Sequence, residues 1–166
     1  MRNQDFAALY VAGLQEARGL EEMLIQAMPR LIEAAEDRDL VETLRAHLTE
    51  TRKQHDRVRE LAERNGASGT APRDPAIAAM IATAEASTLR LARGDARDAM
   101  LIALAQRIAH YEVAVYGTLA AYAKTLGRHD EKRVLAAILE EERAADDDLS
   151  DVAVALVDPP PVHVAA

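Results

Sequence analysis

Residues 98–127 read DAMLIALAQRIAHYEVAVYGTLAAYAKTLG, which has the pattern of one long amphipathic helix. Apolar side chains recur here at intervals of three, four and eight positions, and such intervals place them on one face of an α-helix: Leu101, Leu104, Ile108, Tyr116 and Leu119. Glu112 stands inside that apolar stripe, and Gly127 follows as a helix stop. The pattern predicts a helix over about 96–126 that buries one face and carries a carboxylate on it.

The same period extends outward in both directions and predicts further helices. The predicted spans are about 3–35, 39–65, 75–93, 96–126 and 130–157. Asp37 or Asp39 can cap the second helix and Gly66 can end it. Four long helices then form two tight hairpins, joined by a longer connection that holds a short helix. A single crossover of this kind is typical of an all-α, ferritin-like four-helix bundle.

The domain is expected to cover 1–157, followed by a flexible, Pro-rich tail over 158–166. Apolar residues make up 49% of the chain and aromatic residues only 3%, which suits an Ala- and Leu-rich bundle. Net charge is −8, from 20 basic and 28 acidic residues, so binding to nucleic acid is not expected. With no signal peptide or membrane span recognised and no cysteine, we expect a cytoplasmic protein.

Each long helix carries a glutamate on or beside its apolar stripe. On the first, third and fourth long helices, Glu21, Glu112 and Glu142 interrupt the stripe directly. The stripe of the second long helix is less regular around Glu50. A carboxylate on a core face is costly unless it is paired or binds a metal ion.

The first hairpin brings two of these glutamates to one level. Glu21 precedes Glu36, in the turn, by nearly the same number of positions as Glu50 follows it. At the rise of an α-helix, each is roughly 22 Å from the turn.

The second hairpin repeats this arrangement. Glu112 precedes Gly127 by the same number of positions as Glu142 follows it. If the hairpins pack together, all four carboxylates meet in the middle of the bundle. Two divalent ions would neutralise them, and oxygen ligands suit iron or manganese.

A second interpretation needs no metal. Any one glutamate near an apolar stripe can extend its carboxylate to water. The core glutamates could also be protonated or paired with Arg18, Arg52 or Arg107. The protein would then be a non-catalytic bundle that works through oligomerisation or partner binding, with a degenerate metal site.

Four segments carry a resemblance that covers nearly the whole chain: LEEMLIQAMPRLIEAAED (20–37), HLTETRKQ (47–54), residues 98–127 and LEEERAADDDL (139–149). Within 98–127, the run HYEVAVYGTL (110–119) is the most specific. The sequence resembles the YciE/YciF-type ferritin-like proteins, a bacterial family linked to stress. The resemblance implies a rubrerythrin-related bundle with a di-metal centre, iron most naturally, that handles O₂ or peroxide. The electron donor is unknown, because this chain has no rubredoxin-like cysteine site.

The chain departs from the pattern that the resemblance implies. Bundles with such a centre place a histidine three positions after the glutamate on two helices. Here those positions are Lys53 and Ala145. Ala109 also stands where members of the family commonly carry a glutamate.

His47 and Asp146 are candidate replacements, because each lies about one turn from a core glutamate on the same helix. Gln54 could bind weakly or support a ligand. The expected metal ligands are therefore Glu21, Glu50, Glu112, Glu142, His47 and Asp146. Gly117, inside a helix, suggests a close contact between helices or is simply tolerated there. We expect a small oligomer, a homodimer.

Overall fold

The structure, a computed structural model, describes residues 2–157. The predicted tail over 158–166 lies outside the described residues. The described part contains five α-helices and no strand: α1 (Arg2–Ala34), α2 (Arg38–Arg64), α3 (Pro75–Thr88), α4 (Asp95–Thr125) and α5 (His129–Val157). None of the described helices is long and apolar enough to cross a bilayer.

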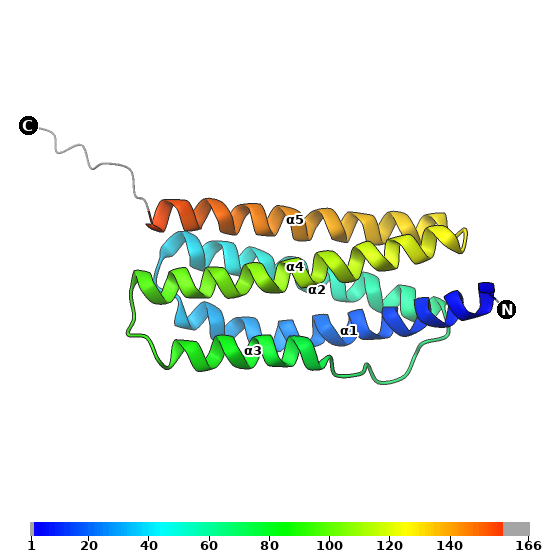
Figure 1. The fold of residues 1–166 in the computed structure, drawn as a ribbon, viewed down its shortest axis with the longest axis horizontal. Helices are drawn as coiled ribbons and strands as arrows, with labels where there is room; N and C mark the ends of the chain where they lie inside the picture. The colour runs from blue at the N-terminus through cyan, green and yellow to red at the C-terminus, as the bar shows by residue number, and fades with distance from the viewer. Residues whose placement is uncertain (1, 158–166) are drawn as a thin grey trace, which may run out of the picture.

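The four long helices form two antiparallel hairpins, α1–α2 and α4–α5 (Figure 1). The hairpins pack through contacts of α1 with α4 and of α2 with α5. Helices α2 and α4 run in the same direction, so the chain between them must return along the whole bundle (Figure 1). The loop over 65–74 and helix α3 make that crossover, and α3 packs on α1 and α4. The predicted ferritin-like four-helix bundle is confirmed.

The residues predicted to begin and end helices do so in the structure. Asp37 caps α2, and its carboxylate accepts a hydrogen bond from the Leu40 amide at 2.8 Å. Gly66 and Gly127 follow α2 and α4 with φ values of 78° and 71°. Other residues rarely adopt this left-handed conformation, so both glycines end their helices.

Helix α3 is shorter than predicted. Asp74 caps it through the amides of Ala76 and Ile77, and Pro75 takes its first position. The helix ends at Thr88, not near residue 93. Leu89 is 89% exposed, so the bundle offers no apolar surface that would stabilise another turn.

Two apolar clusters fill the two ends of the bundle and a third packs between α1, α3 and α4, with a polar layer between the two ends. One cluster includes Tyr10, Leu14, Ala17, Val58, Leu61, Tyr116, Leu119, Leu135 and Ile138. The other includes Leu31, Leu40, Leu44, Leu101, Leu104 and Leu149. On α1, α4 and α5 the buried glutamate lies between residues of these two clusters in the sequence: Glu21, Glu112 and Glu142. The packing of the ends therefore places this layer in the middle of the bundle.

Two glycines of α1 lie at close contacts, Gly13 with α4 and Gly19 with the crossover loop. A Cβ atom on Gly13 would lie 2.7 Å from a methyl group of Leu119, and one on Gly19 would overlap the carbonyl oxygen of Pro72. A Cβ atom on Gly117 would meet nothing within 4 Å. The suggested close contact is therefore absent at Gly117, and the glycine is simply tolerated at a position where a Cβ atom would meet open space.

Candidate metal centre

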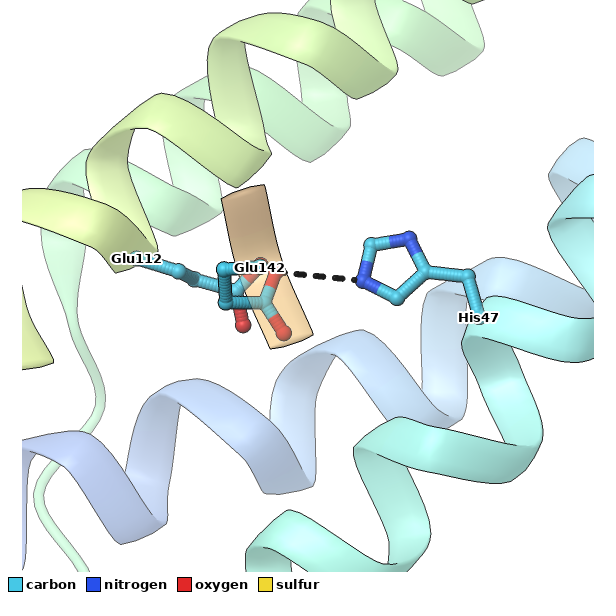
Figure 2. Close-up of side chains that lie close together, drawn as sticks. All are labelled: His47, Glu112 and Glu142. Carbon is cyan, nitrogen blue, oxygen red and sulfur yellow. Dashed lines mark ion pairs between the residues drawn. The ribbon is translucent and has the colours of Figure 1, made fainter. Parts of the chain in front are cut away.

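Three side chains from three helices converge in the polar layer. His47 of α2, Glu112 of α4 and Glu142 of α5 each offer a ligand atom, and these atoms lie within 4.8 Å of one another. His47 Nε2 is 3.3 Å from Glu142 Oε2, and Figure 2 shows the imidazole directed at the paired carboxylates. We call these residues the three-residue cluster.

The carboxylates of this layer are almost completely removed from solvent. Glu21 and Glu112 are 0% exposed and Glu142 is 1% exposed. Among the described residues, neither oxygen of Glu112 has a hydrogen-bond partner, and one oxygen each of Glu21 and Glu142 also lacks one. Buried polar atoms in proteins are nearly always satisfied. This donor set therefore fits a bound cation.

Burial changes the proton affinity of these groups. The pKa of Glu112 is well above its ordinary value because the side chain is buried, and the charges on Glu142 and Glu21 raise it further. The pKa of Glu21 is also raised by burial, although the hydrogen bond from Tyr116 opposes the shift. Without a cation, burial favours the protonated form of both carboxyl groups, and a divalent ion would displace those protons.

Two neutral side chains hold the carboxylates in place. The hydroxyl of Tyr116 donates to Glu21 Oε1, which ties α4 to α1. Gln54 Nε2 donates to Glu142 Oε1 at 2.6 Å. Gln54 and His47 are two turns apart on one face of α2, so they approach Glu142 from either side. Gln54, a possible supporting residue on sequence grounds, thus contacts a candidate ligand.

Glu50 lies at the same level of α2, but its carboxylate is directed away from the cluster. Its side chain is 32% exposed. Lys53 Nζ lies 2.8 Å from one carboxylate oxygen, and Arg57 Nη2 lies 3.3 Å from the other. The structure therefore does not bring the Glu50 carboxylate into the three-residue cluster.

Asp146 has a different partner. Its side chain is 19% exposed, and Oδ2 lies 3.6 Å from Nε2 of the exposed His110. Of the six predicted ligands, the structure brings together His47, Glu112 and Glu142, with Glu21 buried beside them in electrostatic contact with Glu112 and Glu142.

A pocket of about 250 Å³ between α2 and α5 borders the centre. His47, Glu50 and Glu142 line it together with Glu141 and Ala145. A histidine is expected at position 145 in a standard centre, and the alanine leaves that volume open. Of the three buried glutamates, Glu142 lines this pocket and Glu21 and Glu112 do not.

Two residues of this region, Arg57 and Glu141, were missed by the sequence reasoning. Arg57 binds both oxygens of Glu141 through two guanidinium nitrogens, with Nη1 at 2.8 Å from Oε1, and it also contacts Glu50. The heptad spacing of Glu50 and Arg57 was a signal that they share one face of α2. In a chain so rich in charged residues, that spacing alone does not distinguish them from a solvated pair.

Comparison with known proteins gives consistent relatives. The profile of the family described as "Domain of unknown function (DUF892)" matches residues 5–159. Protein YciF of Escherichia coli K12 is 33% identical over 147 residues, covering 88% of this chain and 89% of YciF.

Solved structures agree with this relationship. The crystal structure of the E. coli stress protein YciF has a TM-score of 0.85 at 32% identity, covering 93% of this chain and 98% of that one. YcfI from Rhodopseudomonas palustris, proposed to be a structural protein, has a TM-score of 0.83 at 36% identity, covering 87% of this chain and 92% of that one. The matches in sequence and in fold both span most of the chain, and the protein belongs to the DUF892 family that includes YciF-like proteins.

Proposed function

We propose that this protein binds two divalent metal ions, iron or manganese, in the buried polar layer, and that it reacts with O₂ or peroxide under stress. One observation carries the proposal: the fully buried Glu112, with both oxygens unsatisfied among the described residues, lies beside Glu142 and His47. An ionised carboxylate buried in this way is costly, and a bound cation is one way to compensate it.

The donor chemistry favours iron or manganese. Carboxylates with one imidazole, and no thiolate, are the ligands that these metals prefer. His47, Glu112 and Glu142 would hold one ion, while Glu21 and a reoriented Glu50 would complete the site for a second. When bound, the metal supplies the redox chemistry that no side chain of this layer can supply alone.

The residues of the chain have separate roles in this proposal. Tyr116 orients Glu21, and Gln54 orients Glu142, as residues behind metal ligands commonly do. The apolar clusters on both sides of the layer limit the access of water. The pocket beside Ala145 admits a molecule as small as O₂ or peroxide. The description of YciF as a stress protein supports a role in stress.

The alternative function is a non-catalytic bundle, and two observations favour it. Ala109 is buried at a position where the resemblance implies a glutamate. Glu50 is already compensated by Lys53 and Arg57. In that case the remaining core glutamates stay protonated and the protein acts through oligomerisation, in line with the structural role proposed for YcfI.

Metal content per chain, measured by inductively coupled plasma mass spectrometry on untagged protein, tests the proposal. Wild type should hold close to two ions of iron or manganese per chain, and the Glu112→Gln, Glu142→Gln double variant should lose them. Arg59→Gln, which changes an exposed residue elsewhere on α2, should retain them. A metal-free wild type that takes up neither metal from solution would exclude the proposal and favour the alternative.

The expected homodimer and the cytoplasmic location belong to the same proposal. Light scattering after size-exclusion chromatography would measure the mass in solution, and cell fractionation would test the location.

A further inference from the structure

Glu50 lies on α2 between two residues that face the centre, but its own carboxylate turns away from the centre. His47 and Gln54, three positions before it and four after it, both reach Glu142 from the same face of α2. Glu50 also lines the pocket that borders the centre. Its carboxylate nevertheless turns toward the surface, where Lys53 and Arg57 contact it. A change of side-chain rotamer, without any movement of the helix, would redirect it toward the pocket.

Arg57 connects the outward-facing Glu50 to the buried layer. Its side chain is 29% exposed, and its guanidinium binds both oxygens of Glu141, while Nη2 also lies 3.3 Å from Glu50 Oε1. Gln54 Nε2 donates to Glu141 Oε2 at 3.2 Å and to Glu142 Oε1 at 2.6 Å, so the Arg57–Glu141 pair is one side chain away from the buried layer.

We propose that Arg57 is a resident counter-cation that holds Glu50 outside the centre, so that the two metal ions bind in a fixed order. This inference rests on the proposed function. The first ion binds at His47, Glu112 and Glu142, whose ligand atoms are already within 4.8 Å of one another. The second ion needs Glu50, and it binds only when Glu50 leaves Arg57 and the more exposed Lys53.

The cost of that release is small, because Arg57 does not lose its other partner. The two hydrogen bonds to Glu141 remain, and bidentate pairs between arginine and carboxylate are the stronger kind. The contact with Glu50 is single, longer and partly exposed, so it is the weaker of the two. Arg57 is thus a positioning residue that weakens the second metal site without blocking it.

Titration of the chelator-stripped full chain with Mn²⁺, followed by calorimetry and by the electron paramagnetic resonance of the ion, tests the order. Wild type should show two phases. Arg57→Gln should strengthen the second phase by about fivefold, the value of a partly exposed ion pair, and leave the first phase within about twofold. Glu50→Gln should remove the second phase and keep the first.

Two further variants complete the design. Arg57→Lys keeps the positive charge but loses the planar guanidinium, so its second Mn²⁺ affinity should lie between those of wild type and Arg57→Gln. This variant also keeps the test usable if Arg57→Gln folds poorly. Arg59→Gln removes the same charge from the same helix at a residue paired only with Asp56 among the described residues, and should behave as wild type.

The outcomes separate this inference from the proposed function. If Mn²⁺ binds but Arg57→Gln leaves the second phase unchanged, or Glu50→Gln still takes two ions, the role of Arg57 is wrong and the metal centre stands. If neither the wild type nor any variant binds Mn²⁺ or Fe²⁺, both are wrong.

Discussion

The phenolic hydroxyl of Tyr116 on α4 donates a hydrogen bond to Oε1 of Glu21 on α1, inside a layer from which solvent is excluded. Both side chains are 0% exposed. The bond satisfies one oxygen of a buried carboxyl group and joins the two hairpins at the level of the centre.

Replacing Tyr116 by Phe should destabilise the metal-free protein by about 1–3 kcal/mol, the cost of leaving a buried acceptor without its donor. The loss should be measured by urea denaturation in the presence of a chelator. Tyr122→Phe is the matched control, because Tyr122 is also on α4 but only partly buried, with its ring edge-on to Phe6. Equal losses in the two variants would mean that the bond to Glu21 contributes nothing.

Much of this arrangement follows from regular residue spacings that can be read in the sequence. An α-helix has a constant rise, so equal spacing from a shared turn places Glu112 and Glu142 at one level of their hairpin, and Glu21 and Glu50 at nearly one level of theirs. The apolar stripes above and below them then determine which face is buried. Repetition along a helix is therefore sufficient to predict the bundle and the level of the polar layer.

The direction of an individual side chain does not follow from regularity. Glu50 has the right position, but Lys53 and Arg57 compete for its carboxylate, and only packing decides that competition. Gly117 looks like a contact point, while the close approaches occur at Gly13 and Gly19. These details depend on neighbours that are distant in sequence.

Asp98 is a second case in which a local pattern conceals a long-range role. It looks like an ordinary acidic residue in the first turn of α4, yet it is 1% exposed. Its carboxylate accepts hydrogen bonds from the backbone amides of Glu36 at 3.1 Å and of Asp37 at 2.6 Å. The side chain therefore connects α4 to the turn between α1 and α2.

Replacing Asp98 by Ala should cost about 2 kcal/mol or more, because two amides lose a charged acceptor in a partly buried turn. Asp95→Ala is the matched control: this residue lies in the same first turn and is exposed, so it shares only the favourable interaction with the helix dipole. Thermal unfolding of both variants would measure the difference. A loss no greater for Asp98→Ala than for Asp95→Ala would contradict the long-range role.

Two glycine substitutions should change stability in opposite directions. Gly19→Ala would bring a Cβ atom into overlap with the Pro72 carbonyl oxygen, so the crossover loop must move, at a cost of about 1–3 kcal/mol. Gly117→Ala meets nothing within 4 Å and should stabilise α4 by up to about 1 kcal/mol through helix propensity. Chemical denaturation of the two variants under one set of conditions gives both signs. A stabilising Gly19→Ala would show that the loop does not rest on α1.

The buried carboxyl groups also predict an unusual dependence on pH. In the folded chain the pKa of Glu112 is raised well above the ordinary value of 4.5, first by burial and then by the charges on Glu142 and Glu21. Between 4.5 and that raised value the folded state holds a proton that the unfolded state has released. Stability of the metal-free protein therefore rises as the pH falls through this window, and it is lost as the pH rises.

We expect the chelator-treated wild type to melt at a higher temperature at about pH 5 than at about pH 8, which can be followed by circular dichroism. Glu112→Gln removes the titrating group and keeps its shape, so its melting temperature should depend less on pH and should exceed that of wild type at the alkaline end. Saturating Mn²⁺ should reverse the trend in wild type, because metal binding requires ionised carboxylates and strengthens as the pH rises. A metal-free wild type that is most stable at the alkaline end would mean that Glu112 is ionised in the folded chain and finds its compensation within the protein.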